Sequence, residues 1–373
     1  MLQLFSYLLI AQLQQPADLS SVNVPKSDRS SLVISADNYD SLTKQIIADA
    51  KNREDALPVR SDACRSQFFL QPKPTKKVVI FFHGFTACPY QFIPLGQSLY
   101  AEGYNVLIPL MPGHGQAGKW NKEKPSPLPT EAKVYQEFGL DWLQKAQNLG
   151  DKVIIGGLSG GGTLAGWLSL ERPQQIEKTL LFAPYLSAAT GIRDLVVRNS
   201  NSYFEWPANP GRDPFGYGGF LLPSLRVFLN MGRDILTKAN QGPSTPMLIV
   251  SSESDQAVGN RDHRILFNQV LQRQPKTWYQ DFERSLQVPH AMMTEMEGNR
   301  YYEVLNTIAK AYIKSDVTWA EVQEIGYRMT RGKSFDTAVT ELNLKSRISP
   351  EMAAMMTMVD KRKIVINRNP SWR

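Results

Sequence analysis

A serine flanked by glycines is the first feature of this chain that could do chemistry. The pentapeptide GLSGG (residues 157–161) follows the apolar run 153–155 and precedes residues 163–170, which we predict to be helical. A G-x-S-x-G turn between a strand and a helix is so sharp that only small residues fit around the serine, whose hydroxyl then projects above the sheet edge. We therefore predict that Ser159 is a nucleophile.

A serine hydroxyl is a poor nucleophile at neutral pH, so it needs a base and a group that orients the base. In the strand-turn-helix version of this chemistry the chain order is serine, acid, histidine. Of the four histidines, His83 and His114 precede the serine in glycine-rich turns, and His263 falls in a predicted helix with charged neighbours, where we expect it to be exposed. His290 follows the last core strand in a loop. We predict that His290 is the base, the alternative being a loop histidine satisfied by hydrogen bonds.

The acid is expected just after the predicted strand 247–251, where the chain carries Glu253 and Asp255. Asp255 lies further along the loop, from which its side chain can turn toward His290. We predict Asp255 as the acid, with Glu253 as the alternative.

The tetrahedral intermediate of acyl transfer carries an oxyanion that backbone N–H groups must stabilise. One donor is the residue after the nucleophile, here Gly160, and the other comes from the loop after the apolar strand 78–82. In that loop Gly84 permits a tight turn, and we predict that the Phe85 N–H faces the site. The side chain of His83 is interpreted as structural, bonded to neighbouring backbone.

Strands and helices alternate along the chain, which favours a mostly parallel sheet covered on both faces. The predicted strands are 66–71, 78–82, 106–110, 152–155, 178–182, 247–251 and 277–282. The predicted helices are 40–51, 89–100, 130–149 with Thr130 as its cap, 163–170, 261–272 and 300–314. We divide the chain into an N-terminal segment (1–63), a core (64–314) and a helical C-terminal extension (315–373).

Residues 185–245 interrupt this alternation with an insertion far longer than the usual connection. The insertion is rich in Gly, Pro and aromatic residues, and we call it the predicted lid. It could line an apolar substrate pocket or bury its aromatic side chains in a small core of its own. The substrate-binding candidates are Tyr185, Phe204, Trp206 and Phe220.

The C-terminal extension is expected to contain one or two helices, including 350–358 with Ser349 as its cap, and to end in a basic tail. The tail could meet anionic lipid or simply be solvated. Its basic residues are Lys361, Arg362, Lys363, Arg368 and Arg373.

The composition of the 373 residues, with 42% hydrophobic and 21% charged residues, is ordinary for a globular protein. The net charge of +7 is dispersed and accompanies no nucleic-acid-binding motif.

No apolar run approaches the roughly 20 residues of a membrane-spanning helix. Residues 4–11 are apolar but follow no Lys or Arg, so they are compatible with an export signal, a membrane contact or a buried helix. Exported and cytoplasmic locations both stay open.

Only two cysteines are present, too few for a disulfide scaffold. Cys64 lies at the start of a predicted strand, and Cys88 lies in the loop after the next one. They could form one bridge, which would favour an oxidising compartment, or be two unrelated buried thiols.

Three motifs together, HGF (83–85), PGHG (112–115) and GLSGG, with the late acid and histidine, resemble the α/β-hydrolase superfamily, in particular its monoglyceride lipase and carboxylesterase branch. The resemblance covers about residues 64–314. It implies an eight-stranded sheet with a lid after the sixth strand, and triad roles for Ser159, Asp255 and His290 beside the oxyanion donors Phe85 and Gly160. In such a fold the strand before HGF is not the neighbour of the HGF strand, which weakens a hairpin argument for a Cys64–Cys88 bridge.

The resemblance implies a serine hydrolase that cleaves carboxylic esters through an acyl-enzyme, with an apolar acyl group under the lid. A serine peptidase or a thioesterase is the nearest alternative, because a triad does not determine the leaving group. A non-catalytic binding module would be expected to have a broken triad. The chain has no P-loop, no G-x-G-x-x-G after a strand and no metal-ligand spacing, and this chemistry needs no cofactor. The expected partner is a small ester, with peripheral membrane contact as an option, while the oligomeric state is not determined by the sequence.

Overall fold

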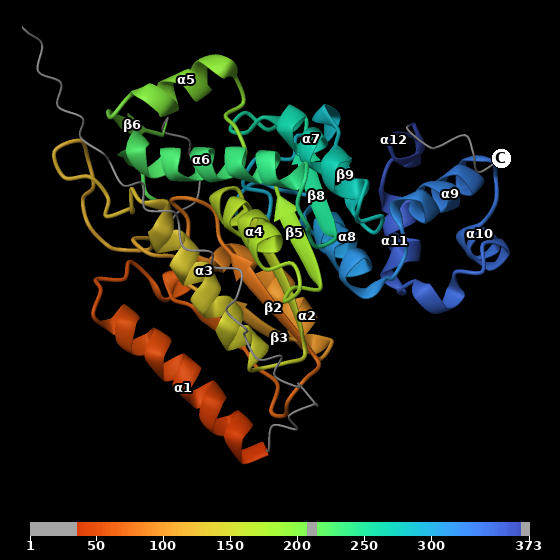
Figure 1. Ribbon diagram of the computed structural model, residues 1–373, viewed down its shortest axis with the longest axis horizontal. Coiled ribbons are helices and arrows are strands. Elements are labelled where there is room, and N and C mark those ends of the chain that lie inside the picture. Colours follow the sequence, from red (N-terminus) through yellow and green to blue (C-terminus); the bar gives the residue numbers. More distant parts are fainter. Residues whose placement is uncertain (1–35, 207–214, 367–373) are drawn as a thin grey trace, which may run out of the picture. The chain divides into compact units, whose positions relative to one another are not determined.

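The computed structural model describes residues 36–206 and 215–366 (Figure 1). The apolar segment 4–11 and the basic residues Arg368 and Arg373 lie outside these ranges. Within them, no helix has the length and apolar character that crossing a membrane requires.

The described strands form one seven-stranded sheet in the order β1-β3-β2-β4-β5-β8-β9. Six of the seven strands run parallel, and β1 pairs antiparallel with β3 at one edge. The strands are β1 (Gln67–Phe69), β2 (Lys77–Phe82), β3 (Asn105–Ile108), β4 (Lys152–Leu158), β5 (Lys178–Phe182), β8 (Met247–Ser252) and β9 (Trp278–Phe282). All seven predicted strands are therefore present, with ends that move by a few residues.

The expected count of eight strands is wrong for the described residues. Ahead of β1, the described residues form helix α1 (Ala36–Asp55), which contains the predicted helix 40–51, and a 3-10 turn, η2 (Asp62–Cys64). Tyr39 of α1 donates a hydrogen bond to the Gln71 carbonyl oxygen (3.1 Å), which fastens α1 beside the sheet edge as a helix. Consequently the predicted lid follows the fifth strand of this sheet along the chain and not the sixth.

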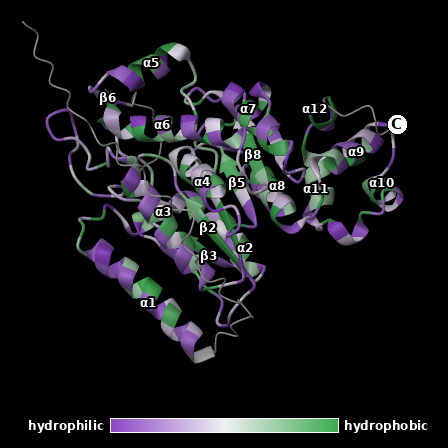
Figure 2. Cartoon of the chain, viewed as in Figure 1, coloured by the Kyte–Doolittle hydropathy of each residue, from purple (hydrophilic) through white to green (hydrophobic). Residues whose placement is uncertain are grey.

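The central strands are continuous apolar runs because both faces of the sheet are covered. Every residue of β3, β5 and β8 is buried, as are all residues of β2 except its first. Figure 2 shows hydrophobic residues concentrated in these strands, while α1 on the outside is largely hydrophilic.

Right-handed crossovers place the helices on both faces of the sheet. The chain moves one way along the sheet from β2 to β3 and the other way from β3 through β9, so the connecting helices lie on opposite faces. Helix α2 (Ile93–Ala101) lies on one face, where its C-cap Glu102 pairs with Lys314 of α8 (Tyr302–Lys314) at 2.8 Å. The other face carries α3 (Ala132–Gln147), α4 (Gly160–Glu171) and α7 (Asn260–Leu271).

Thr130 is not the cap of α3, because the helix begins at Ala132 and Glu131 occupies the N-cap position.

The described part of the predicted lid contains two helices and a hairpin. They are α5 (Gly191–Asn199), the antiparallel pair β6 (Tyr203–Glu205) and β7 (Gly219–Leu221), and α6 (Leu222–Ala239). A proline in the first turn of α6 suits a helix start, because proline lacks the N–H that would be unpaired there. Helix α6 packs along α4, the helix that follows the Ser159 turn (Figure 1).

The described part of the C-terminal extension, residues 315–366, forms four α-helices, more than the one or two expected. They are α9 (Trp319–Thr330), α10 (Phe335–Glu341), α11 (Glu351–Met358) and α12 (Lys361–Val365). Ser349 is not the cap of α11, because Pro350 occupies the N-cap position. Lys178 of β5 joins the extension to the sheet, since its buried ammonium donates hydrogen bonds to the carbonyl oxygens of Tyr312 and Ser315 (2.7 and 2.6 Å).

Candidate active site

Ser159 occupies a strained turn between β4 and α4. Its backbone has φ 53° and ψ −117°, a conformation that a residue with a side chain rarely adopts. The turn is held from both sides, because the Ser159 N–H donates to the Phe182 carbonyl oxygen (2.9 Å) and its own carbonyl accepts from the N–H groups of Thr163 and Tyr185 (2.8 and 3.1 Å). Strain that the surroundings hold in place is typical of functional positions.

Two glycines allow this turn to be so tight. A Cβ on Gly157 would collide with the backbone of Gly161, and a Cβ on Gly161 would collide with the carbonyl oxygens of Phe82 and His83. The start of α4 therefore packs directly against the end of β2. This contact brings the residue after the serine next to the loop that follows β2.

His290 and Asp255 form a hydrogen-bonded pair. The Nδ1 atom of His290 lies 2.6 Å from Oδ2 of Asp255, whose side chain is completely buried, while the His290 side chain is 27% exposed. A buried carboxylate on Nδ1 is the arrangement that orients a histidine as a general base.

The other oxygen of Asp255, Oδ1, accepts hydrogen bonds from the N–H groups of Ala257 (2.7 Å) and Val258 (3.3 Å). Burial raises the pKa of Asp255, but the positive charge and hydrogen bond of His290, together with these two N–H donors, outweigh it and hold the pKa below its usual value. Asp255 is therefore ionised at neutral pH.

Glu253, the alternative acid, points elsewhere. Its carboxylate lies 2.6 Å from the ammonium of Lys363 in α12 and accepts a hydrogen bond from the Arg284 N–H (3.1 Å). The bond to Lys363 and the bond from Arg284 lower the pKa of Glu253. Of the two loop carboxylates, only Asp255 has a hydrogen bond to His290 among those in the described residues.

Phe85 and Gly160 lie beside each other, as the oxyanion-hole prediction requires. A Cβ on Gly160 would come within 3.2 Å of the Phe85 Cβ. The Gly84 carbonyl oxygen accepts from the Ala87 N–H (3.1 Å) and lies 3.0 Å from His83 Nδ1. In a trans peptide the C=O and the following N–H point in opposite directions, so these contacts also define the direction of the Phe85 N–H.

His83 has a structural role, as interpreted from the sequence. Its Nε2 accepts a hydrogen bond from the Met111 N–H (3.0 Å), so its proton sits on Nδ1, which donates to the Gly84 carbonyl. Burial, and then the nearby His114, keep the pKa of His83 well below its ordinary value. The ring is neutral at pH 7. It holds the loop of the predicted oxyanion hole (residues 83–88, called the oxyanion loop below) to the turn after β3.

His114 and His263 are both fully buried. Burial lowers the pKa of His114 to about 4. The prediction that His263 is exposed is wrong. Its ring lies between Ser251 Oγ (2.8 Å) and the Pro184 carbonyl oxygen (2.7 Å), within hydrogen-bond distance of both. The signal was present in the sequence: positions 263, 266, 267 and 270 share one helix face, and the last three are Leu, Phe and Val.

The four predicted substrate-binding residues take different positions. Phe204, Trp206 and Phe220 form a ring cluster with centroids 5.2 to 5.5 Å apart, and Phe220 reaches the Phe85 ring at 4.9 Å. The cluster thus extends from the oxyanion loop to the surface, where Phe204 is 39% exposed. Tyr185 is buried, and its backbone bonds hold the Ser159 turn.

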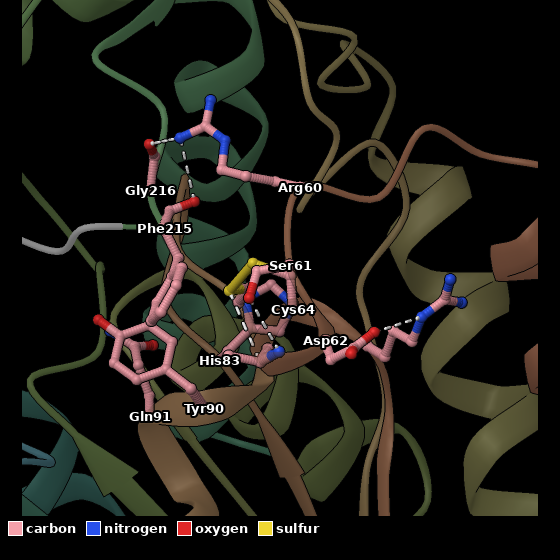
Figure 3. Close-up of a disulfide and its surroundings, with 12 residues drawn as sticks. Arg60, Ser61, Asp62, Cys64, His83, Tyr90, Gln91, Phe215 and Gly216 are labelled. Carbon is pink, nitrogen blue, oxygen red and sulfur yellow. Dashed lines mark hydrogen bonds and ion pairs between the residues drawn. A yellow bond between two sulfur atoms is a disulfide. The ribbon is translucent and has the colours of Figure 1, made fainter.

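Cys64 and Cys88 form a disulfide with a Cα–Cα distance of 4.9 Å (Figure 3). Cys88 ends the oxyanion loop, while Cys64 belongs to η2. Arg60, just ahead of η2, donates to the carbonyl oxygens of Phe215 (3.4 Å) and Gly216 (2.6 Å) in the predicted lid. The oxyanion loop, η2 and the lid are therefore joined at one place.

In the described ranges no cluster of His, Cys, Asp or Glu could hold a metal ion.

Comparisons with known proteins agree with the fold. A family described as alpha/beta hydrolase fold matches residues 77–209. A Mycoplasma pneumoniae protein named "Putative esterase/lipase 3" is 34% identical over 125 residues, covering 33% of this chain and 43% of that protein. The thermostable monoacylglycerol lipase of a Bacillus species is 33% identical over 96 residues, covering 26% and 36%. The chain thus spans less than half the length of either relative.

Solved structures support the same fold. One structure, from work on the metagenome-derived lipolytic enzymes LipS and LipT, is 15% identical with a TM-score of 0.54, covering 66% of this chain and 96% of that one. The Paleococcus ferrophilus monoacylglycerol lipase is 16% identical with a TM-score of 0.50, covering 65% and 95%. The solved structures show an α/β-hydrolase fold, and the family match over residues 77–209 together with the two sequence relatives supports a place in the α/β-hydrolase superfamily, on its esterase and monoglyceride lipase branch.

Proposed function

We propose that the protein is a serine hydrolase that cleaves carboxylic esters through an acyl-enzyme. The observation that carries this proposal is the hydrogen bond between His290 and the buried Asp255, in the same molecule as the strained Ser159 turn. The similarity to proteins named as esterases and monoacylglycerol lipases supports esters as the substrate class.

In the proposed reaction, Ser159 Oγ attacks the ester carbonyl carbon while His290 Nε2 takes the hydroxyl proton. The carbonyl oxygen becomes negatively charged and accepts hydrogen bonds from the N–H groups of Phe85 and Gly160. His290 then gives the proton to the departing alkoxide, which leaves an ester on Ser159 and releases the alcohol. A water activated by the same histidine attacks that ester and releases the acid. Asp255 stays ionised and orients the ring throughout.

An apolar acyl group fits the surroundings of the oxyanion loop. Phe85 is in edge contact with Phe220 and Phe228, at centroid distances of 4.9 and 5.5 Å, and Phe220 continues into Phe204 and Trp206. An acyl chain that replaced some of these ring contacts would be shielded from water. The predicted lid is thus proposed as the wall of the acyl pocket.

Helix α5 supports the further proposal of peripheral contact with a lipid surface. Ile192, Leu195 and Val196 share one face of this helix and are 78%, 62% and 48% exposed. Of the two arginines in this helix, Arg198 pairs with Asp194, while Arg193, which donates to the Gln256 carbonyl oxygen, has no acidic partner among the described ion pairs and would favour anionic lipid. An exposed apolar face of this kind is typical of an interaction site.

The direct test is hydrolysis of p-nitrophenyl esters of increasing acyl length by the wild type and Ser159→Ala. We expect turnover that disappears in the variant and increases with acyl length up to the capacity of the pocket. Acyl thioesters and peptide anilides would be assayed in parallel. Turnover of those substrates alone would contradict the ester proposal, and ester turnover that survives in Ser159→Ala would contradict the nucleophile.

A further inference from the structure

A buried carboxyl group lies in the loop that carries His290. Glu297 is only 8% exposed, seven residues after the proposed base. Its Oε2 accepts a hydrogen bond from the Thr294 hydroxyl (3.1 Å), and its Oε1 accepts one from the Tyr90 hydroxyl (3.2 Å). Burying a carboxyl group is costly unless hydrogen bonds compensate, so a role for this group is expected.

Gln91 connects this carboxyl group to the oxyanion loop. Its amide nitrogen donates to Glu297 Oε1, and its amide oxygen accepts the Gly84 N–H at 2.7 Å. Gln91 is 2% exposed, so water does not compete for these contacts. The orientation of the amide is determined by its partners, because the end facing the Gly84 N–H must accept and the end facing the carboxyl group must donate.

The link from Glu297 through Gln91 ends at Gly84, the residue before Phe85. The Gly84 N–H is held by Gln91 and the Gly84 carbonyl by His83 and Ala87, so both polar groups of Gly84 are bonded. Thr86, on the other side of Phe85, has φ 68°, an unfavourable conformation that needs support from its surroundings. Without the bond to Gln91 the loop would gain freedom just where the oxyanion donor lies.

We propose that Gln91 and Glu297 are positioning residues that hold the Phe85 N–H in its catalytic direction and tie the oxyanion loop to the His290 loop. This inference rests on the proposed serine hydrolase function. Glu297 acts through Gln91 and Gly84 and does not touch the substrate. The proposal explains why a carboxyl group is buried between two loops that must keep a common geometry during the reaction.

The test measures the oxyanion hole with a probe that does not depend on the natural substrate. A p-nitrophenyl alkylphosphonate phosphonylates an activated serine, releases p-nitrophenolate, and places its P=O oxygen in the oxyanion hole. The variants are Glu297→Ala and Gln91→Leu, with Glu297→Gln as the conservative replacement that can still accept from Gln91. Glu295→Ala is the matched control, since Glu295 is an exposed carboxylate in the same loop.

We expect phosphonylation of Ser159 to slow about 10- to 100-fold in Glu297→Ala and Gln91→Leu, since a small displacement of a catalytic group has effects of this size. Glu297→Gln and Glu295→Ala should stay within about threefold of the wild type. With an ester substrate the loss should appear in kcat, with KM nearly unchanged, because the oxyanion forms only during the reaction. A general folding defect would not produce this split or the recovery in Glu297→Gln.

Gln91→Leu keeps the buried volume, so it tests the proposal even if Glu297→Ala does not fold. Wild-type phosphonylation rates in both Glu297→Ala and Gln91→Leu would overturn the positioning role and leave the proposed function intact. Failure of the wild type to be phosphonylated at Ser159 would instead overturn the proposed function, and the positioning role with it.

Discussion

The hydroxyl of Ser252 donates a 2.7 Å hydrogen bond to the carbonyl oxygen of Val288. Ser252 is the last residue of β8, three residues before Asp255, and Val288 lies two residues before His290. Both residues are fully buried. This bond ties the loop of the proposed acid to the loop of the proposed base, so that the Asp255–His290 geometry does not depend on one hydrogen bond alone.

Ser252→Ala should therefore lower kcat more than it affects substrate binding. We expect a loss of roughly tenfold, because the His290 loop can shift, and a destabilisation of about 1–3 kcal/mol from the unpaired Val288 carbonyl. The control is Ser285→Ala, because Ser285 is exposed and lies in the same segment as Val288, ahead of His290 in the chain. Steady-state kinetics and urea unfolding measure both effects, and an unchanged kcat would contradict the positioning of His290 by Ser252.

Asp255→Asn should reduce kcat by about four orders of magnitude, because an amide at this position can favour the wrong tautomer of His290. Glu253→Gln should stay within about threefold of the wild type, since Glu253 pairs with Lys363 on the surface. The two variants are compared in the same ester assay. The reverse order of effects would assign the acid to Glu253.

The Cys64–Cys88 disulfide leads to two expected results, one for the number of free thiols and one for the free energy of unfolding. Denatured, non-reduced protein should contain no free thiol, and two free thiols would rule out the bridge. The double variant Cys64→Ser/Cys88→Ser should be less stable by about 3.5 kcal/mol, because without the bridge, which spans a sequence separation of 24, the unfolded chain gains conformational entropy. The reduced wild type should match the variant in urea unfolding, which separates loss of the bridge from effects of the serines.

Buried neutral histidines make stability depend on pH. The pKa of folded His114 is about 4, whereas that of an unfolded histidine is near 6.5. Between these values the unfolded chain binds a proton that the folded chain does not, so stability should fall as pH is lowered from 6.5 to 4, by up to ~1.4 kcal/mol per pH unit for this residue. His114→Gln should show a shallower fall in unfolding experiments across this range, with parallel curves above pH 7. An unchanged slope below pH 6.5 would contradict the assignment.

The exposed face of α5 predicts binding to lipid vesicles. Ile192→Ser/Leu195→Ser should reduce co-sedimentation with anionic liposomes, because both side chains are mostly exposed and would enter the interface. Hydrolysis of a short, soluble ester should be nearly unchanged, since these residues do not touch the Ser159 turn in the described contacts. Equal sedimentation of variant and wild type would remove α5 as the contact, and a truncation after residue 348 would then test the basic C-terminal helices.

The sequence was most informative where structure is local. All seven strands of the sheet were predicted from short apolar or aromatic stretches between turn signals. The clearest is 78–82, which is a continuous apolar run because it is covered on both faces. The Ser159 turn was predictable for a similar reason, since the need for glycine at 157 and 161 is a steric property of the turn and of the helix that follows it. Chain order together with position in the loops after two predicted strands favoured Asp255 over Glu253 and His290 over His263, and Asp255 and His290 form a 2.6 Å pair.

Only the tertiary structure decided contacts between distant segments. Nothing in residues 294–297 distinguishes the buried Glu297 from the exposed Glu295, because the difference comes from Tyr90 and Gln91, about 200 residues earlier. The bridge between Cys64 and Cys88 likewise depends on where η2 meets the segment after β2. Propensity and periodicity act over a few residues, whereas burial is determined by whichever segments the fold brings together.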